Sequence, residues 1–158
     1  MKIKKYKKLA KLIILIKTTL IISSNAISQT LLTCDAPKGK GYYYQGPLIS
    51  KKDAGWGDDG ISKGSFSLIK NKEKVDILYK DASGSLVSST ADGGFVIPLG
   101  NNRINFSFLV SYPNVTAELF TFNIKNKKLA YSQHKYGSSM MDKRDLFVAH
   151  CLLLKKSG

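Results

Sequence analysis

Histidine and cysteine are scarce in this sequence, with two residues of each among 158. A structural zinc site takes four ligands and a catalytic one at least three, mostly cysteine or histidine. His134 and His150 are far apart in the chain, and only His150 has a cysteine beside it, Cys151. Adjacent side chains on a strand point to opposite faces, so these two would not share a site there. The sequence therefore predicts no metal ligands and no cofactor.

A helical pattern of apolar residues is also missing after residue 30. Apolar and polar residues alternate instead, which is typical of antiparallel strands with one wet face. The clearest case is RINFSFLVSY at 103–112, where every second residue from Ile104 to Tyr112 is apolar or aromatic. We expect an all-β fold, a single antiparallel meander of about 7–9 strands forming a small barrel or sandwich. Shorter alternating segments, separated by turn residues, lie at 65–70, 75–80, 85–90, 95–99, 118–124, 129–133 and 146–152.

Long apolar runs are confined to the N-terminus. Residues 1–26 start with a basic stretch, MKIKKYKKLAK, followed by a short apolar one, LIILIKTTLII. This order is typical of a signal peptide, and Lys17 interrupts an apolar stretch that would need about 20 residues to span a membrane. We expect cleavage between Ala26 and Ser28 and a periplasmic or secreted protein with no stable membrane span. An uncleaved anchor, or a lipoprotein modified at Cys34, is the alternative.

The remaining chain of about 130 residues is long enough for one domain with a core but not for two. Cys34 and Cys151 are its only cysteines, and in an exported protein such a pair is most simply one disulfide. Two buried free thiols are the alternative. The disulfide would make the first and last ordered segments neighbours in space. We expect a lead-in at 27–40 that carries Cys34, a single β domain at 41–152 and a basic tail at 153–158.

Acidic residues are few compared with basic ones. The chain has 25 Lys and Arg against 11 Asp and Glu, a formal charge of +14. Seven of the lysines lie in residues 1–26, so the rest carries 18 basic residues against the same 11 acidic ones. This excess favours contact with anionic surfaces such as lipopolysaccharide, cell wall or acidic proteins. The scattered lysines and the expected compartment argue against nucleic acid as a partner.

The stretch GDDGISKG, residues 57–64, contains a G-x-S-x-G pattern centred on Ser62. In α/β-hydrolases this pattern joins a buried strand to a helix, but here DAGWGDD precedes it and the alternating SFSLIKN follows. We interpret it as a turn before a strand. Asp53, Asp58 and Asp59 lack the ligand spacing of an EF-hand loop and are most simply solvated turn carboxylates. The sequence predicts no catalytic residue.

An aromatic group lies among glycines near the start of the expected domain. It consists of Tyr42, Tyr43, Tyr44 and Trp56, the single tryptophan of the chain. Aromatic residues are enriched at interfaces and ligand sites, so we expect these four to form a surface that binds a partner or ligand. Ordinary packing along an edge strand is the alternative.

Seven short motifs are spread over the chain: GYYY at 41–44, GW at 55–56, DGIS at 59–62, DASG at 81–84, DGG at 92–94, ELFTF at 118–122 and VAHC at 148–151. In this combination the chain resembles small exported proteins of unknown function from Gram-negative bacteria. It is also similar to the periplasmic C-type lysozyme inhibitors in size, compartment and β architecture. Its Ser83-Gly84 lacks the aromatic residue of their inhibitory loop. The resemblance implies a periplasmic or secreted location and brings no activity.

These observations favour an exported, non-enzymatic β domain that binds a protein or ligand at the bacterial cell envelope. We expect it to act as a monomer, with an envelope protein, an anionic surface or a small ligand as its partner. The alternatives are a small secreted hydrolase that uses Ser62 or a histidine, and a structural or host-directed secreted factor.

Overall fold

The computed structural model describes residues 28–72, 74–81, 83–113, 115–137 and 141–153. The expected signal peptide and residues 154–158 of the expected tail lie outside the described residues. Within these ranges no helix is long and apolar enough to cross a membrane, and every regular element is a strand. The strands are β1 (Ser28–Tyr43), β2 (Gly55–Gly60), β3 (Ser65–Asn71), β4 (Lys74–Lys80), β5 (Leu86–Ser88), β6 (Phe95–Asn101), β7 (Asn105–Tyr112), β8 (Thr116–Asn123), β9 (Lys128–Lys135) and β10 (Lys143–Leu153).

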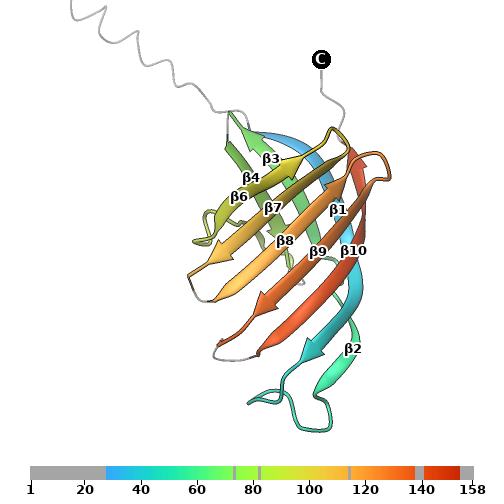
Figure 1. Ribbon diagram of the computed structural model, residues 1–158, viewed down its shortest axis with the longest axis vertical. Coiled ribbons are helices and arrows are strands. Elements are labelled where there is room, and N and C mark those ends of the chain that lie inside the picture. The colour runs from blue at the N-terminus through green and yellow to red at the C-terminus, as the bar shows by residue number, and fades with distance from the viewer. Residues whose placement is uncertain (1–27, 73, 82, 114, 138–140, 154–158) are drawn as a thin grey trace, which may run out of the picture.

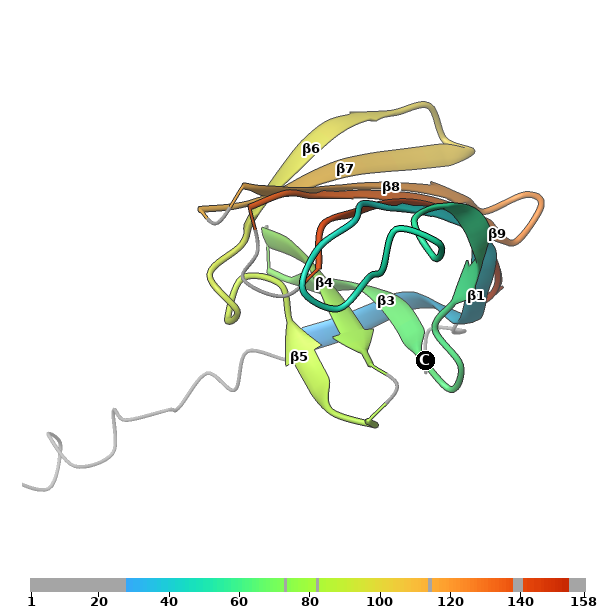
Figure 2. The same cartoon turned by 90° about the horizontal axis from the view of Figure 1, so that it is seen from below.

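These strands form one antiparallel sheet that curls into a half-barrel (Figure 1). Their order is β5-β4-β3-β1-β10-β9-β8-β7-β6, and β2 pairs with part of β1. The pairing of β1 with β10 joins the two ends of the described chain. Figure 2 shows β6 to β9 on one side of the interior and β3 to β5 on the other. Since β5 and β6 end the order, the barrel is left open between them.

The predicted all-β class is confirmed, with two strands more than the segments expected from the sequence. Strand β1 contains residues 28–40 of the expected lead-in and lies at the centre of the sheet between β3 and β10. Strand β2 has the sequence GWGDDG, and its Gly55 and Gly57 pair with Tyr43 and Gly41 of β1. Glycines replace apolar residues at these positions, which removes the alternation that predicts a strand.

The core lies on the inner face of the half-barrel. In β8 the residues Thr116, Glu118, Phe120 and Phe122 point inward and are buried. The register places Phe120 beside Phe108 of β7 and beside Tyr131 of β9. The ring centroids of Phe120 and Tyr131 are 4.8 Å apart. Buried aromatic residues of this kind supply much of the apolar area that stabilises a small domain.

The predicted disulfide is confirmed: Cys34 of β1 is bonded to Cys151 of β10. The two residues are direct partners across the strands, with 3.9 Å between their Cα atoms. Both are buried in the apolar part of the inner face. The bond closes a loop of 117 positions, for which the chain-entropy model gives a stabilisation of roughly 3–5 kcal/mol.

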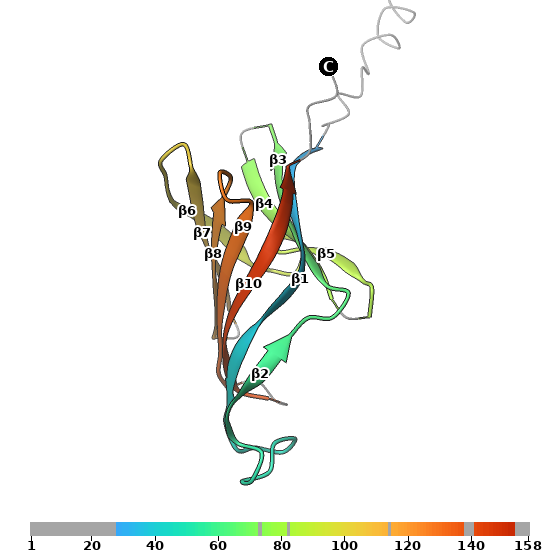
Figure 3. The same cartoon turned by 90° about the vertical axis from the view of Figure 1, so that its right-hand side faces the viewer.

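A bulge between Asp35 and Lys38 divides β1 into two parts. The first part pairs with β3 and the second with β2. The chain passes from β2 to β3 through the stretch around Ser62, where the Ile61 amide donates to the Pro37 carbonyl and Lys63 has a φ of 61°. The G-x-S-x-G pattern therefore forms a turn that lies against the bulge of β1. Figure 3 shows how the hairpin of β1 and β2 extends beyond the ends of the neighbouring strands.

Candidate ligand-binding pocket

A pocket of about 300 Å³ opens on the inner face of the half-barrel. The register explains its position, because two rows of paired residues with different polarity meet there. Phe147 and Tyr131 pair in the apolar row, and Asp145, Gln133 and Glu118 pair in the next row toward the ends of β1 and β2. We call this cavity the inner pocket. Its aromatic lining consists of Phe66, Tyr79, Tyr112, Tyr131 and Phe147, and its charged lining of Lys80, Asp81, Asp92, Glu118, Lys135, Lys143 and Asp145.

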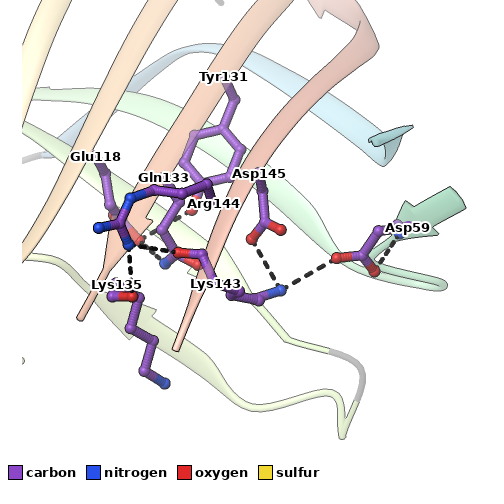
Figure 4. A network of polar contacts seen from close by, with 9 residues as sticks. Asp59, Glu118, Tyr131, Gln133, Lys135, Lys143, Arg144 and Asp145 are labelled. Atoms are coloured by element: carbon purple, nitrogen blue, oxygen red, sulfur yellow. Dashed lines mark hydrogen bonds and ion pairs between the residues drawn. The ribbon is translucent and has the colours of Figure 1, made fainter. Parts of the chain in front are cut away.

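Glu118 is a buried acid in the wall formed by β8 and β9, with 8% of its surface exposed. Its Oε1 atom accepts hydrogen bonds from the Tyr131 hydroxyl at 3.0 Å and from the Gln133 amide nitrogen at 2.7 Å (Figure 4). Burial raises the pKa of Glu118, and the two hydrogen bonds oppose this effect without cancelling it. The nearby Asp92 raises the pKa further, while Lys135 lowers it.

A second polar group joins β2 to β10. The Nζ atom of Lys143 lies 2.8 Å from Asp145 Oδ2 and 3.2 Å from Asp59 Oδ2, as Figure 4 shows. Asp145 is buried, and burial raises its pKa in spite of Lys143. Burial alone would raise the pKa of Asp59 too, but hydrogen bonds from Tyr43 and the Gly60 amide, together with Lys143, lower it. One ammonium group is thus shared by two carboxylates.

Gly41 makes room for these two carboxylates. It pairs with Asp145 on one side and with Gly57 on the other. A Cβ atom on Gly41 would lie 2.7 Å from Asp145 Oδ1 and 3.1 Å from Asp59 Oδ2. Any larger residue would therefore push the carboxylates apart. Asp145 Oδ1 has no hydrogen-bond partner among the residues that the structure describes.

The opposite wall of the inner pocket is formed by β4 and the turn that follows β5. Asp76 accepts hydrogen bonds from the hydroxyls of Ser88 and Thr90, the latter at 2.6 Å, and so holds this turn against β4. The Tyr79 hydroxyl donates to Asp92 Oδ2 at 2.7 Å. Burial and this hydrogen bond raise the pKa of Tyr79. The phenol therefore stays neutral at physiological pH.

The four aromatic residues predicted from the sequence do not share one surface. Tyr42, Tyr44 and Trp56 lie together, with ring centroids 5.0 Å apart for the two tyrosines and 5.5 Å for Tyr42 and Trp56. Tyr43 is the neighbour of Tyr42 and Tyr44 on an extended chain, so it points to the inner face. There it contacts Asp59, and burial followed by that contact raises its pKa.

The outer group contains two residues that the sequence did not indicate. Tyr136 packs edge-on to Tyr44 at 6.5 Å between centroids. The Arg144 guanidinium lies 5.4 Å from the Tyr44 ring centre and 5.7 Å from that of Tyr136. Its Nη1 atom donates to the carbonyls of Lys135 and Lys143, which fixes its position. We call Tyr42, Tyr44, Trp56, Tyr136 and Arg144 the outer aromatic cluster.

Residues considered for catalysis or metal binding lie away from the inner pocket. Ser62, His134 and His150 are exposed, and the two histidines alternate with residues of β9 and β10 that point inward. Asp58 forms a surface ion pair with Lys40 at 2.6 Å. Among the described residues no group of three or more His, Cys, Asp or Glu side chains could hold a metal ion.

The polar residues of the inner pocket were missed by the sequence analysis, although a signal was present. Glu118 stands two residues before Phe120, and Asp145 two before Phe147, so each occupies an inward position of its strand. A carboxylate in phase with core residues is unusual, because burying it is costly. Its partners across the sheet could not be identified, since they depend on the register between strands.

Comparisons with models of known protein families, with curated proteins and with solved structures found no match. The resemblance to small exported Gram-negative proteins therefore stays a prediction from the sequence. The inner pocket and the outer aromatic cluster carry the functional argument.

Replacing Glu118 by Gln should change how stability depends on pH. The folded protein holds the Glu118 proton more tightly than the unfolded chain, so this contribution is complete below the unfolded pKa of about 4.3 and is lost as pH rises through the raised folded pKa. Each pKa unit corresponds to about 1.4 kcal/mol. Gln keeps an acceptor for Tyr131 and Gln133 but does not ionise. The free energy of unfolding of the wild type should therefore fall relative to E118Q as pH increases, measured by urea unfolding.

The groups that face Glu118 are the same in both proteins: Tyr131 and Lys135 on β9, Tyr112 on β7, Tyr79 on β4 and Asp92 in the turn after β5. Their titration, like that of Asp145, cancels in the difference to first order. A difference that is constant with pH would show that the Glu118 pKa is not raised.

Proposed function

We propose that this chain is an exported, non-enzymatic domain that binds a small ligand in the inner pocket at the bacterial cell envelope. The observation that carries the proposal is a pocket of about 300 Å³ with a buried Glu118 in its wall. Ligand sites are concave, mostly apolar and furnished with a few polar groups, and their volumes begin at about 300 Å³. The inner pocket has this size and combines aromatic side chains with a larger number of polar and charged ones, which supports a ligand of modest size that carries a polar group.

Export is supported by two independent features. Residues 1–26 contain a basic stretch followed by a short apolar one, as a signal peptide does. Cys34 is joined to Cys151 by a disulfide. Disulfides persist in oxidising compartments such as the bacterial periplasm and the extracellular space. We place the mature protein in one of these two compartments.

The arrangement of the candidate nucleophile and bases favours binding over the hydrolase alternative. A nucleophile and its base must come within hydrogen-bond reach of each other. Ser62 lies in the exposed turn between β2 and β3, whereas His134 and His150 point away from the inner pocket on β9 and β10. The inner pocket instead offers hydrogen-bonding and aromatic groups suited to holding a ligand.

The proposal predicts that filling part of the inner pocket weakens ligand binding. Thr116 is buried and lines the pocket, while Thr121 of the same strand faces outward beside Ser107. We expect at least one of three probes, 2-phenylethylamine, 2-phenylethanol or phenylacetate, to bind the wild type with a Kd below about 1 mM. The Thr116→Phe variant should bind at least about tenfold more weakly, and Thr121→Phe should bind normally. Titrations followed by NMR chemical shifts measure both.

If none of the probes binds, or if Thr116→Phe binds as well as the wild type, the inner pocket is not a site for ligands of this size. Thr121→Phe provides the matched control, because it introduces the same side chain on the same strand.

The outer aromatic cluster favours a second binding role, attachment to an anionic envelope surface. Trp56 is 71% exposed beside Tyr42 and Tyr44, and Arg144 lies between two tyrosine rings. Exposed aromatic residues with a fixed arginine are typical of interface hot spots. The positive balance of the chain outside residues 1–26 supports an anionic partner such as lipopolysaccharide.

Trp56 reports on this second role directly, because it is the only tryptophan. Its fluorescence should shift to shorter wavelength when lipopolysaccharide micelles are added and should stay unchanged with phosphatidylcholine vesicles. The shift should weaken in Arg144→Gln and in about 1 M NaCl, where charges are screened beyond roughly 3 Å. An unchanged emission spectrum with the micelles would remove the outer aromatic cluster as the attachment surface.

A further inference from the structure

We infer that the ligand of the inner pocket is an organic cation, an ammonium or guanidinium group on a small apolar body, with Glu118 as its counter-charge. This inference rests on the proposed function and adds the chemical class of the ligand. It is carried by the arrangement of charges and rings around the cavity.

Glu118 is the buried charge of the inner pocket that lacks an ionic partner. None of the three ion pairs found among the described residues includes it. Its hydrogen bonds from Tyr131 and Gln133 both end on Oε1. Oε2 takes neither of them. Ionised carboxylates are costly to bury unless they are paired, and a bound cation at Oε2 would supply the pair.

One of the lysines that line the inner pocket is already engaged in ion pairs. Lys143 is shared by Asp145 and Asp59, so the three groups together leave one negative charge when both carboxylates are ionised. Asp92 adds another at the opposite wall, where it accepts from Tyr79. The whole charged lining has four carboxylates and three ammonium groups, Asp81, Asp92, Glu118 and Asp145 against Lys80, Lys135 and Lys143. With Asp59 beside Lys143, carboxylates outnumber ammonium groups here, in a chain with 25 basic residues against 11 acidic ones. A local excess of negative charge in a basic protein points to a positively charged ligand.

The rings of the inner pocket suit the same class of ligand. Cations are attracted to the faces of aromatic rings within about 6 Å of the centroid, and Lys143 Nζ already lies 5.9 Å from the centre of the Phe147 ring. Tyr131 and Tyr112 stand next to Glu118, and burial raises the pKa of Tyr112 to about 12. These phenols therefore remain neutral and present their rings to an apolar body beside the charged group.

Three probes with one carbon skeleton separate charge from shape: 2-phenylethylamine, 2-phenylethanol and phenylacetate. We expect the protonated amine to bind the wild type at least about tenfold more tightly than the alcohol, and phenylacetate to bind most weakly. This preference is measured on the wild-type protein by NMR titration at neutral pH, so it needs no variant to fold.

The Glu118→Gln variant identifies the residue responsible. It should lose about tenfold or more in affinity for the amine and keep its affinity for the alcohol. The control is Asp58→Asn, which removes one carboxylate on the outer face, where Asp58 pairs with Lys40. Asp58→Asn should bind all three probes as the wild type does.

The outcomes distinguish this inference from the proposed function. If none of the three probes binds, the proposed function fails and the inference with it. If the alcohol binds as tightly as the amine, or Glu118→Gln keeps the preference for the amine, the inner pocket is a ligand site but the cation assignment is wrong. A neutral polar ligand held by Glu118 and Gln133 would then be favoured.

Discussion

The pairing of β1 with β10 holds the two halves of the sheet together. It joins two antiparallel runs, β3 to β5 on one side and β6 to β9 on the other. The two strands pair from Leu32 and Leu153 to Tyr43 and Lys143, with one bulge between Asp35 and Lys38. The Cys34–Cys151 disulfide fastens this seam inside the core. The inner pocket takes Phe66 and Tyr79 from one run and Glu118 and Tyr131 from the other. Without the pairing of β1 with β10, the two runs would not be joined and the inner pocket between them would not form.

The inner face changes from apolar to polar along the length of β1 and β10. The end with the disulfide is apolar, and the end with Lys143 carries a row of polar side chains that pair in register across β8, β9 and β10. Burying Glu118 and Asp145 opposes folding, while the aromatic core and the disulfide offset that cost. Polar groups retained at such a cost are characteristic of functional sites. The same register that builds the core therefore also assembles the inner pocket.

Much of the fold could be predicted from local patterns. The alternation in 103–112 identified β7, and the compartment inferred from residues 1–26 made a disulfide the simplest use of two cysteines. Strands β1 and β2 escaped prediction because glycines occupy inward positions where apolar residues would signal a strand. The inner pocket was harder to predict from the sequence. Gln133 and Lys143 lie beside Glu118 and Asp145 only because of the register between strands, which the sequence does not reveal. The alternation of side chains along an extended strand would have been enough to place Tyr43 on the opposite face from Tyr42 and Tyr44.

The role of Glu118 as the counter-charge of a cation in the inner pocket can be measured by a carboxyl-carbon NMR titration of Glu118, with and without saturating 2-phenylethylamine. In the free protein burial should hold the Glu118 pKa above its usual value, and the bound ammonium should lower it, because a nearby positive charge favours the ionised carboxylate. A Glu118 pKa that is the same in the free and the bound protein would contradict the account.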